Sequence, residues 1–207
     1  MHRLTRHLVL FSATAAACTG LYVALAPEEP IWGMSMATAY VGLVLVGLTL
    51  AIGPWNRLRA RRNPVSTYLR RDIGIWAGLV SVLHVVFGLQ VHFRGRMWLY
   101  FVPEGGHSFP LRIDPFGLTN YAGLVATFVL LMLLVLSNDA SLRALGPGRW
   151  KSLQRWNYAG ALLILAHGAV YQIIEKRSWG FVAAGLVIAL AAMAMQLAGY
   201  RLATKKA

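Results

Sequence analysis

One apolar stretch, long enough to cross a bilayer and carrying a histidine, constrains this chain more than any other part of it. The stretch runs from Ile73 to Phe93, and His84 lies near its middle. Its length and composition predict a transmembrane helix. Ionisable side chains are costly inside the hydrocarbon layer, so a histidine at that depth is a candidate functional residue.

A second apolar stretch repeats this design. It runs from Asn157 to Ile174 and contains His167. His84 and His167 follow the starts of their stretches by 11 and 10 residues, which places each about 15–16 Å along its helix. If the two helices run in the same direction, the two imidazoles lie at one depth near the membrane midplane. Paired imidazoles are suitable axial ligands for a haem iron, so we expect both histidines to be metal ligands.

The composition predicts an all-α membrane protein. Hydrophobic residues make up 57% of the 207 residues and charged residues only 13%, which is unlike a soluble domain. We expect one integral membrane domain over residues 1–207, a bundle of six transmembrane helices with a haem between the third and the fifth. The expected helices span residues 7–26, 33–53, 73–93, 116–136, 157–174 and 179–200.

The first of these helices resembles a signal peptide, because Ala24-Leu25-Ala26 is a possible cleavage site. We expect it to be retained, because the apolar run is long for a signal peptide and Pro27 follows the site directly.

The distribution of basic residues predicts the orientation. Fifteen of the 20 Lys and Arg residues fall in the two termini and in segments 54–72 and 137–156. Cytoplasmic loops are enriched in Lys and Arg, so we expect both termini to be cytoplasmic. The same distribution explains the net charge of +13 without nucleic acid as a partner.

Small residues flank both histidines at helical spacing. Such residues leave room for a planar cofactor, although they also allow close packing of helices. Beside two histidines of equal depth, the cofactor is the favoured interpretation. The cofactor-binding residues predicted with the two histidines are Gly78, Ser81, Gly88, Gly160 and Tyr171.

The remaining histidines are weaker candidates. His92 lies about 12 Å further along its helix than His84, at the expected outer interface. An interfacial polar role fits it best, and ligation of a second group stays open. We expect surface roles for His2, His7 and His107. Cys18 is the only cysteine, which excludes an internal disulfide and a cysteine cluster for iron–sulfur or zinc ligation.

Three groups of residues resemble the ferric reductase-like transmembrane domain family, and the likeness covers roughly residues 40 to 175. It is closest to the compact branch that includes the haem-binding membrane subunit of the bacterial periplasmic methionine sulfoxide reductase system. The groups are Arg70-Arg71-Asp72-Ile73-Gly74-Ile75-Trp76 leading to His84, Ser137-Asn138-Asp139 through Gly146 to Trp150, and Leu153-Gln154-Arg155-Trp156-Asn157-Tyr158 leading to His167.

The resemblance implies a b-type cytochrome of the inner membrane, with one haem b held by His84 and His167. It also implies electron transfer from a cytoplasmic flavin-linked donor to an extracytoplasmic acceptor, such as a methionine sulfoxide reductase. Where that branch has a second histidine, this chain has Gln154. An amide is a poor haem ligand, so a second haem or a bound FMN stays open.

The leading hypothesis is therefore an electron-transfer subunit of an oxidoreductase system, supplied by a flavin reductase or by quinol. The chain has no nucleotide-binding motif, so it needs a separate donor. A transporter or proton pathway that uses the two histidines is a rival, although the spans contain no acidic residue. A haem-free anchor for a partner enzyme is another.

Haem propionates would also need polar partners at one edge of the cofactor. Candidates on the expected outer side are Arg94, Arg96, Trp98, Tyr171 and Lys176, and on the inner side Arg70, Arg71 and Arg155. The sequence does not choose between the two sides.

Overall fold

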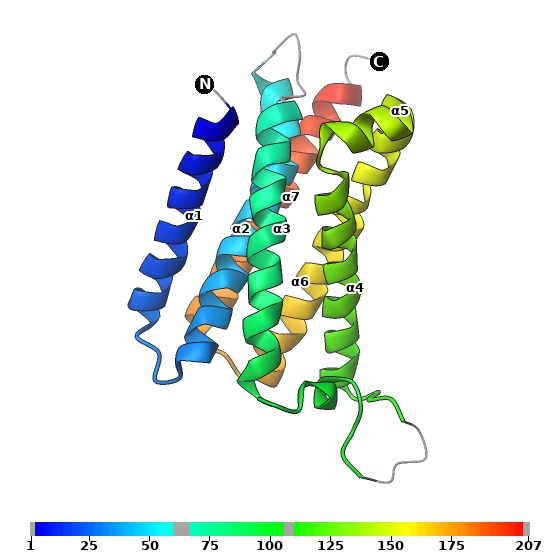
Figure 1. The fold of residues 1–207 in the computed structure, drawn as a ribbon. Helices are drawn as coiled ribbons and strands as arrows, with labels where there is room; N and C mark the ends of the chain where they lie inside the picture. The colour runs from blue at the N-terminus through cyan, green and yellow to red at the C-terminus, as the bar shows by residue number, and fades with distance from the viewer. Residues whose placement is uncertain (1–2, 60–66, 106–109, 205–207) are drawn as a thin grey trace.

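The computed structural model describes residues 3–59, 67–105 and 110–204, and these form helices and no strand (Figure 1). His2 and His107 lie outside the described residues. The elements are α1 (Arg3–Leu25), α2 (Pro30–Leu58), α3 (Thr67–Val91), the short 3₁₀ helix η1 (Met97–Tyr100), α4 (Pro115–Leu136), α5 (Asp139–Gln154), α6 (Trp156–Ile174) and α7 (Trp179–Thr204).

Six helical segments are long and apolar enough to cross a membrane, and the fifth of them joins α5 to α6. The predicted all-α, multi-pass architecture is therefore confirmed. Both described chain ends lie at one end of the bundle, which we call the terminal end (Figure 1). The opposite end, called the loop end, carries the turns between α1 and α2 and between α6 and α7, and the long connection from α3 to α4.

Several spans are longer than the sequence predicts, and α2 exceeds its predicted bounds most. α2 continues through Pro54 to Leu58, and α3 begins at Thr67, before the apolar stretch. The added turns contain charged residues, such as Arg57, Arg70 and Arg71. Apolar length marks the part of a helix that lies in hydrocarbon, whereas the hydrogen-bonded helix extends into the headgroup region.

An additional helix, α5, occupies part of the segment that the sequence interprets as a connecting loop. Asn138 caps it, because its side-chain oxygen accepts a hydrogen bond of 2.8 Å from the backbone N–H of Ser141. Gly146 interrupts the helix with a φ of 71°, a conformation that glycine adopts without strain. The indole of Trp150 donates to the carbonyl of Leu136 at 2.8 Å and holds α5 against the end of α4.

α2 lies at the centre of the packing. It contacts α1, α3, α6 and α7, and it has the most buried residues of any helix. Small residues permit these approaches: a Cβ on Gly42 would lie 3.4 Å from Ser81 of α3, and one on Gly47 would lie 3.6 Å from Ile188 of α7. The main core combines residues of three helices, namely Val41, Leu45, Val46, Leu50, Ile73, Ala77, Val80 and Ala161.

The two helices that carry His84 and His167 do not pack against each other. Among the described residues, no Cα atom of α3 comes within 8 Å of one in α6. α2 and α4 instead contact both of them. The fold thus holds α3 and α6 apart, and side chains occupy the space between their backbones.

Candidate functional site

His84 of α3 and His167 of α6 meet across this space. Their ring centroids lie 6.5 Å apart, and the ring planes are inclined at 76°. The two residues are separated by more than 80 positions in the chain, so only the packing of α3 and α6 around α2 and α4 brings them together. The structure therefore pairs the two histidines that the sequence singles out.

The imidazole of His84 is oriented by α2. Its Nδ1 lies 3.0 Å from the backbone carbonyl of Ser35, and the hydroxyl of Ser35 lies 3.4 Å from the same nitrogen. A carbonyl oxygen only accepts hydrogen bonds, so the bond to it requires a proton on Nδ1. The lone pair of the neutral ring is then on Nε2, the atom that a metal would bind.

α4 orients His167 in the same way. Its Nδ1 lies 2.8 Å from the carbonyl of Thr119, which again assigns the proton to Nδ1 and the lone pair to Nε2. Gly123, one turn further along α4, makes room for the ring. A Cβ built on Gly123 would lie 2.7 Å from Nδ1 of His167, which is closer than side chains pack. We call His84, His167, Ser35, Thr119 and Gly123 the histidine site.

This arrangement is compatible with both imidazoles holding one metal. The ring centroids are 6.5 Å apart, which is close enough for both rings to be ligands of a single ion. Ligating histidines typically donate their other ring N–H to a carbonyl or carboxylate, as both rings do here. Within the described part of the chain, neither Nε2 has a hydrogen-bond partner and no third His, Cys, Asp or Glu completes a metal-binding group.

The other predicted cofactor residues divide into two groups. Gly88 and Tyr171 lie beside the histidines: a Cβ on Gly88 would lie 3.8 Å from the ring of His84, and the rings of Tyr171 and His167 have centroids 4.9 Å apart. The remaining three face neighbouring helices: Gly78 faces Leu134, Ser81 faces Gly42, and Gly160 faces Val129. The alternative that small residues serve helix packing therefore applies at these three positions.

Aromatic rings continue from the histidine site towards the loop end. Tyr171 contacts Phe116 at 6.0 Å, and Phe116 stacks on Tyr100 of η1 at 5.5 Å. The hydroxyl of Tyr171 donates to the side chain of Asn120 at 2.8 Å, and the hydroxyl of Tyr100 donates to the carbonyl of Gly88 at 2.7 Å. Both hydroxyls are therefore satisfied within the protein.

His92 belongs to this aromatic cluster and not to the histidine site. Its Nε2 lies 3.0 Å from a carboxylate oxygen of Glu175 in the turn after α6. Its ring also packs against Tyr100 and Phe116. These contacts give His92 the interfacial polar environment that its position predicts.

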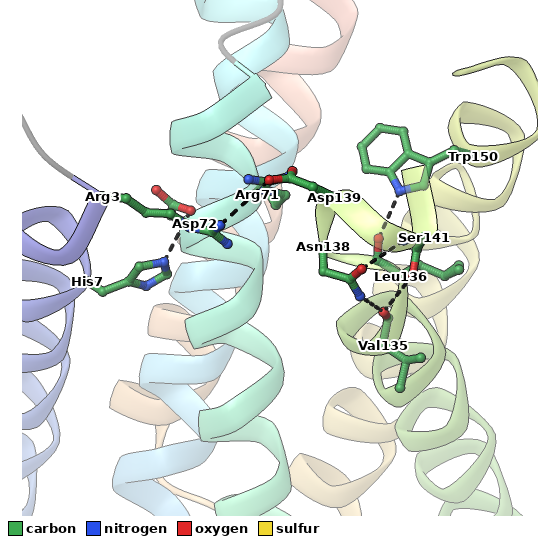
Figure 2. A network of polar contacts seen from close by, with 10 residues as sticks. All are labelled: Arg3, His7, Arg71, Asp72, Val135, Leu136, Asn138, Asp139, Ser141 and Trp150. Carbon is green, nitrogen blue, oxygen red and sulfur yellow. Dashed lines mark hydrogen bonds and ion pairs between the residues drawn. The ribbon is translucent and has the colours of Figure 1, made fainter. Parts of the chain in front are cut away.

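A cluster of charged residues joins three helices at the terminal end (Figure 2). Asp72 of α3 is fully buried, and its Oδ2 accepts a hydrogen bond of 2.8 Å from Arg6 of α1. Its Oδ1 accepts no hydrogen bond from any described residue but lies 3.4 Å from Nε2 of His7, close enough for an ion pair when that ring is protonated. Arg71 pairs with Asp139 at the start of α5. We call Arg6, His7, Arg71, Asp72 and Asp139 the charged cluster.

Compared with models of known protein families, the chain matches none. The family resemblance of the sequence therefore stays a prediction.

The sequence identified both histidines but not the residues that orient them. Ser35 and Thr119 act through backbone carbonyls, which have no sequence pattern. Gly123 acts through the absence of a side chain. One sequence pattern could have identified Gly123: a glycine on another span at the same depth as the histidines.

Proposed function

We propose that this chain is a b-type haem-binding membrane protein that passes electrons across the membrane, and that His84 and His167 would hold the haem iron. The observation that carries this proposal is the pair of imidazoles 6.5 Å apart, each with its Nδ1 held by a backbone carbonyl. Haem iron needs only two ligands from the protein, whereas a structural zinc ion typically takes four.

The residues around the histidines support a fixed pair of ligands. The carbonyls of Ser35 and Thr119 set the tautomer and the direction of each ring. Because these carbonyls belong to the helical backbone, they move little when a ligand binds. When bound, haem supplies a one-electron redox centre whose potential depends on its axial ligands and on burial. The protein contributes the rigid ligand pair and the apolar surroundings.

Electron transfer across a membrane also needs a donor and an acceptor. In line with the distribution of Lys and Arg, we place the terminal end in the cytoplasm and the loop end outside, in the inner membrane of a bacterium. The donor in this proposal is a cytoplasmic flavin reductase or quinol. The acceptor is an extracytoplasmic reductase, and the resemblance noted above suggests a methionine sulfoxide reductase.

The test is a reduced-minus-oxidised absorption spectrum of the purified full-length protein, expressed with haem supplied. We expect the α-band of low-spin haem b in the wild type and its loss in His84→Ala and in His167→Ala. His92→Ala is the matched control, because His92 directly follows the helix that carries His84 but its ring nitrogen pairs with Glu175. It should keep the band.

A colourless wild-type protein would contradict the proposal and favour a transporter or a membrane anchor. A band that survives both single substitutions would mean that haem binds elsewhere. Loss of the band in the His92→Ala variant as well, with unchanged folding, would show that His92 belongs to the ligand set.

A further inference from the structure

Arg177 is a partly buried cation close to the histidine site, and no carboxylate pairs with it among the described residues. It lies in the turn between α6 and α7 at the loop end. The nearest acidic residue in the chain, Glu175, pairs with His92 instead. Burial lowers the pKa of the Arg177 guanidinium, and Glu175 opposes that shift without forming an ion pair. A guanidinium stays protonated even so, and among the described residues no carboxylate forms an ion pair with this positive charge.

The side chain of Arg177 points back into the bundle and not out to solvent. One of its terminal nitrogens contacts the sulfur of Met36 on α2, and the guanidinium lies 5.9 Å from the ring centre of Trp32. Met36 is itself buried and directly follows Ser35, whose carbonyl orients His84. The guanidinium of Arg177 therefore lies against the residue next to the one that orients His84.

This placement is costly unless an anion compensates it. Neither the thioether of Met36 nor the indole ring of Trp32 carries a negative charge. An arginine held within a membrane protein usually faces a functional partner. The guanidinium presents several N–H donors in one plane, which matches the two oxygens of a carboxylate.

We propose that Arg177 binds the carboxylate groups of the haem that His84 and His167 ligate, so that the carboxylate edge of the cofactor faces the loop end. This inference rests on the proposed function, because it concerns the orientation of the same cofactor. It also selects a residue and a side of the membrane that the sequence alone leaves open.

The other cations at the loop end are less suited to this role. Arg112 is bonded to Asp114 at 2.9 Å and to the carbonyl of Leu99 at 2.7 Å, and Arg96 pairs with Glu104 at 2.5 Å. Arg94 and Lys176 are exposed. At the terminal end, Arg71 already pairs with Asp139. Arg177 combines partial burial, closeness to the histidines and the lack of an acidic partner.

The experiment compares haem b with its dimethyl ester, which has the same ring and iron but no carboxylates. Full-length apoprotein from haem-limited cells is titrated with each compound, and the Soret band reports binding. We expect the wild type to bind haem b about tenfold more tightly than the ester, as charge-assisted hydrogen bonds are lost with the ester. In Arg177→Met this preference should fall to about one, with ester affinity unchanged.

Lys176→Met is the matched control, because it removes a neighbouring charge from an exposed side chain. It should keep the wild-type preference, and Arg177→Lys should keep part of it, because a lysine retains the charge without the planar donors.

Two results would overturn this inference without contradicting haem binding itself. One is equal affinity of the wild type for haem b and for the ester, and the other is an Arg177→Met variant that prefers haem b as strongly as the wild type does. The wild-type comparison decides even if a variant fails to fold. A wild type that binds neither compound would contradict the proposed function itself, together with this inference.

Discussion

The charged cluster and the histidine site both join distant parts of the chain, but they differ in whether their polar atoms already have partners within the protein. In the charged cluster, Asp72 is fully buried against Arg6 and His7, and Arg71 reaches Asp139, so acid and base meet within the protein. Figure 2 shows the pairs that Asp72 forms with His7 and Arg71 with Asp139. In the histidine site, each imidazole has one nitrogen bonded to a carbonyl and the other without a partner among the described residues.

This difference separates a structural contact from a binding site. Charges that are already paired stabilise the position of a helix and have little capacity left for a ligand. Two oriented nitrogens with free lone pairs can still bind a ligand. The folded protein fixes their orientation before the ligand binds. We therefore expect substitutions in the charged cluster to change stability, and substitutions in the histidine site to change ligand binding.

The largest expected effect is that of Gly123→Ala. The new methyl group would lie 2.7 Å from Nδ1 of His167, so the ring must move and lose its bond to Thr119. Haem affinity should fall about 10- to 100-fold, which is typical when a residue that orients a ligand is lost. Haem titration of the apoprotein measures this. Gly168→Ala is the control, since it lies next to His167 but has open space around it. Equal losses in both variants would contradict the role of Gly123.

On stability, as opposed to ligand binding, the largest expected effect is that of Asp72→Asn, and the spectrum should not change. The substitution leaves Arg6 and His7 without the buried carboxylate, and loss of one partner of a buried pair costs about 3 kcal/mol. Thermal unfolding in detergent measures the change. Asp139→Asn is the control, because that carboxylate is half exposed and should affect the unfolding midpoint much less. If Asp72→Asn instead removes the α-band while the unfolding midpoint stays unchanged, the charged cluster and the histidine site are coupled.

A smaller loss of stability is expected for Asn138→Ala. The side chain caps α5, which carries Asp139, and removing such a cap costs about 1 kcal/mol. Asn138→Ser, which retains a capping oxygen, should recover most of the loss. An unfolding midpoint for Asn138→Ala that equals the wild-type value would show that α5 does not need its cap.

The smallest effect concerns Asp114, the cap of α4 at the loop end. Slight burial acts to raise the pKa of this carboxyl, but hydrogen bonds from Gly117 and Arg112 outweigh it and lower the pKa. A lowered pKa in the folded state means that the charge stabilises the fold above the ordinary value near 3.8, and that this contribution is lost as the pH falls through the folded value. Asp114→Asn keeps the capping oxygen and removes the charge.

The difference in unfolding midpoint between wild type and Asp114→Asn should therefore be constant near neutral pH and shrink in acid. A difference that grows as the pH falls would mean that the pKa of Asp114 is raised in the folded protein.

Most of the fold was predictable from the sequence, because apolar length alone marks a span in a bilayer. All six spans appear, although α2 and α3 extend beyond their apolar stretches. α5 was not predictable by the same criterion. It is polar, has no buried residue and contains Gly146-Pro147, so nothing in its hydropathy separates it from a loop.

The site was predictable only in part. Histidines in a hydrocarbon layer stand out, so His84 and His167 could be found and their depths compared. Gly78, Ser81 and Gly160 are spaced at helical intervals from the histidines, so the sequence places them on the same helix faces. In the structure, however, they pack against α4 and α2. Periodicity gives the face of a helix and not its neighbour. The role of Arg177 depends on what surrounds it in three dimensions, so its position in the sequence shows only a basic residue in a turn.

The backbone hydrogen bonds of the two imidazoles have a consequence for how this site tolerates mutation. Since main-chain oxygens of Ser35 and Thr119 accept from the rings, no side-chain replacement at either position deletes the acceptor. A genetic screen for pale colonies should therefore recover changes at His84, His167 and Gly123 while passing over many changes at 35 and 119. Because both side chains are buried, small replacements at these two positions should hold the ligands in the same orientation.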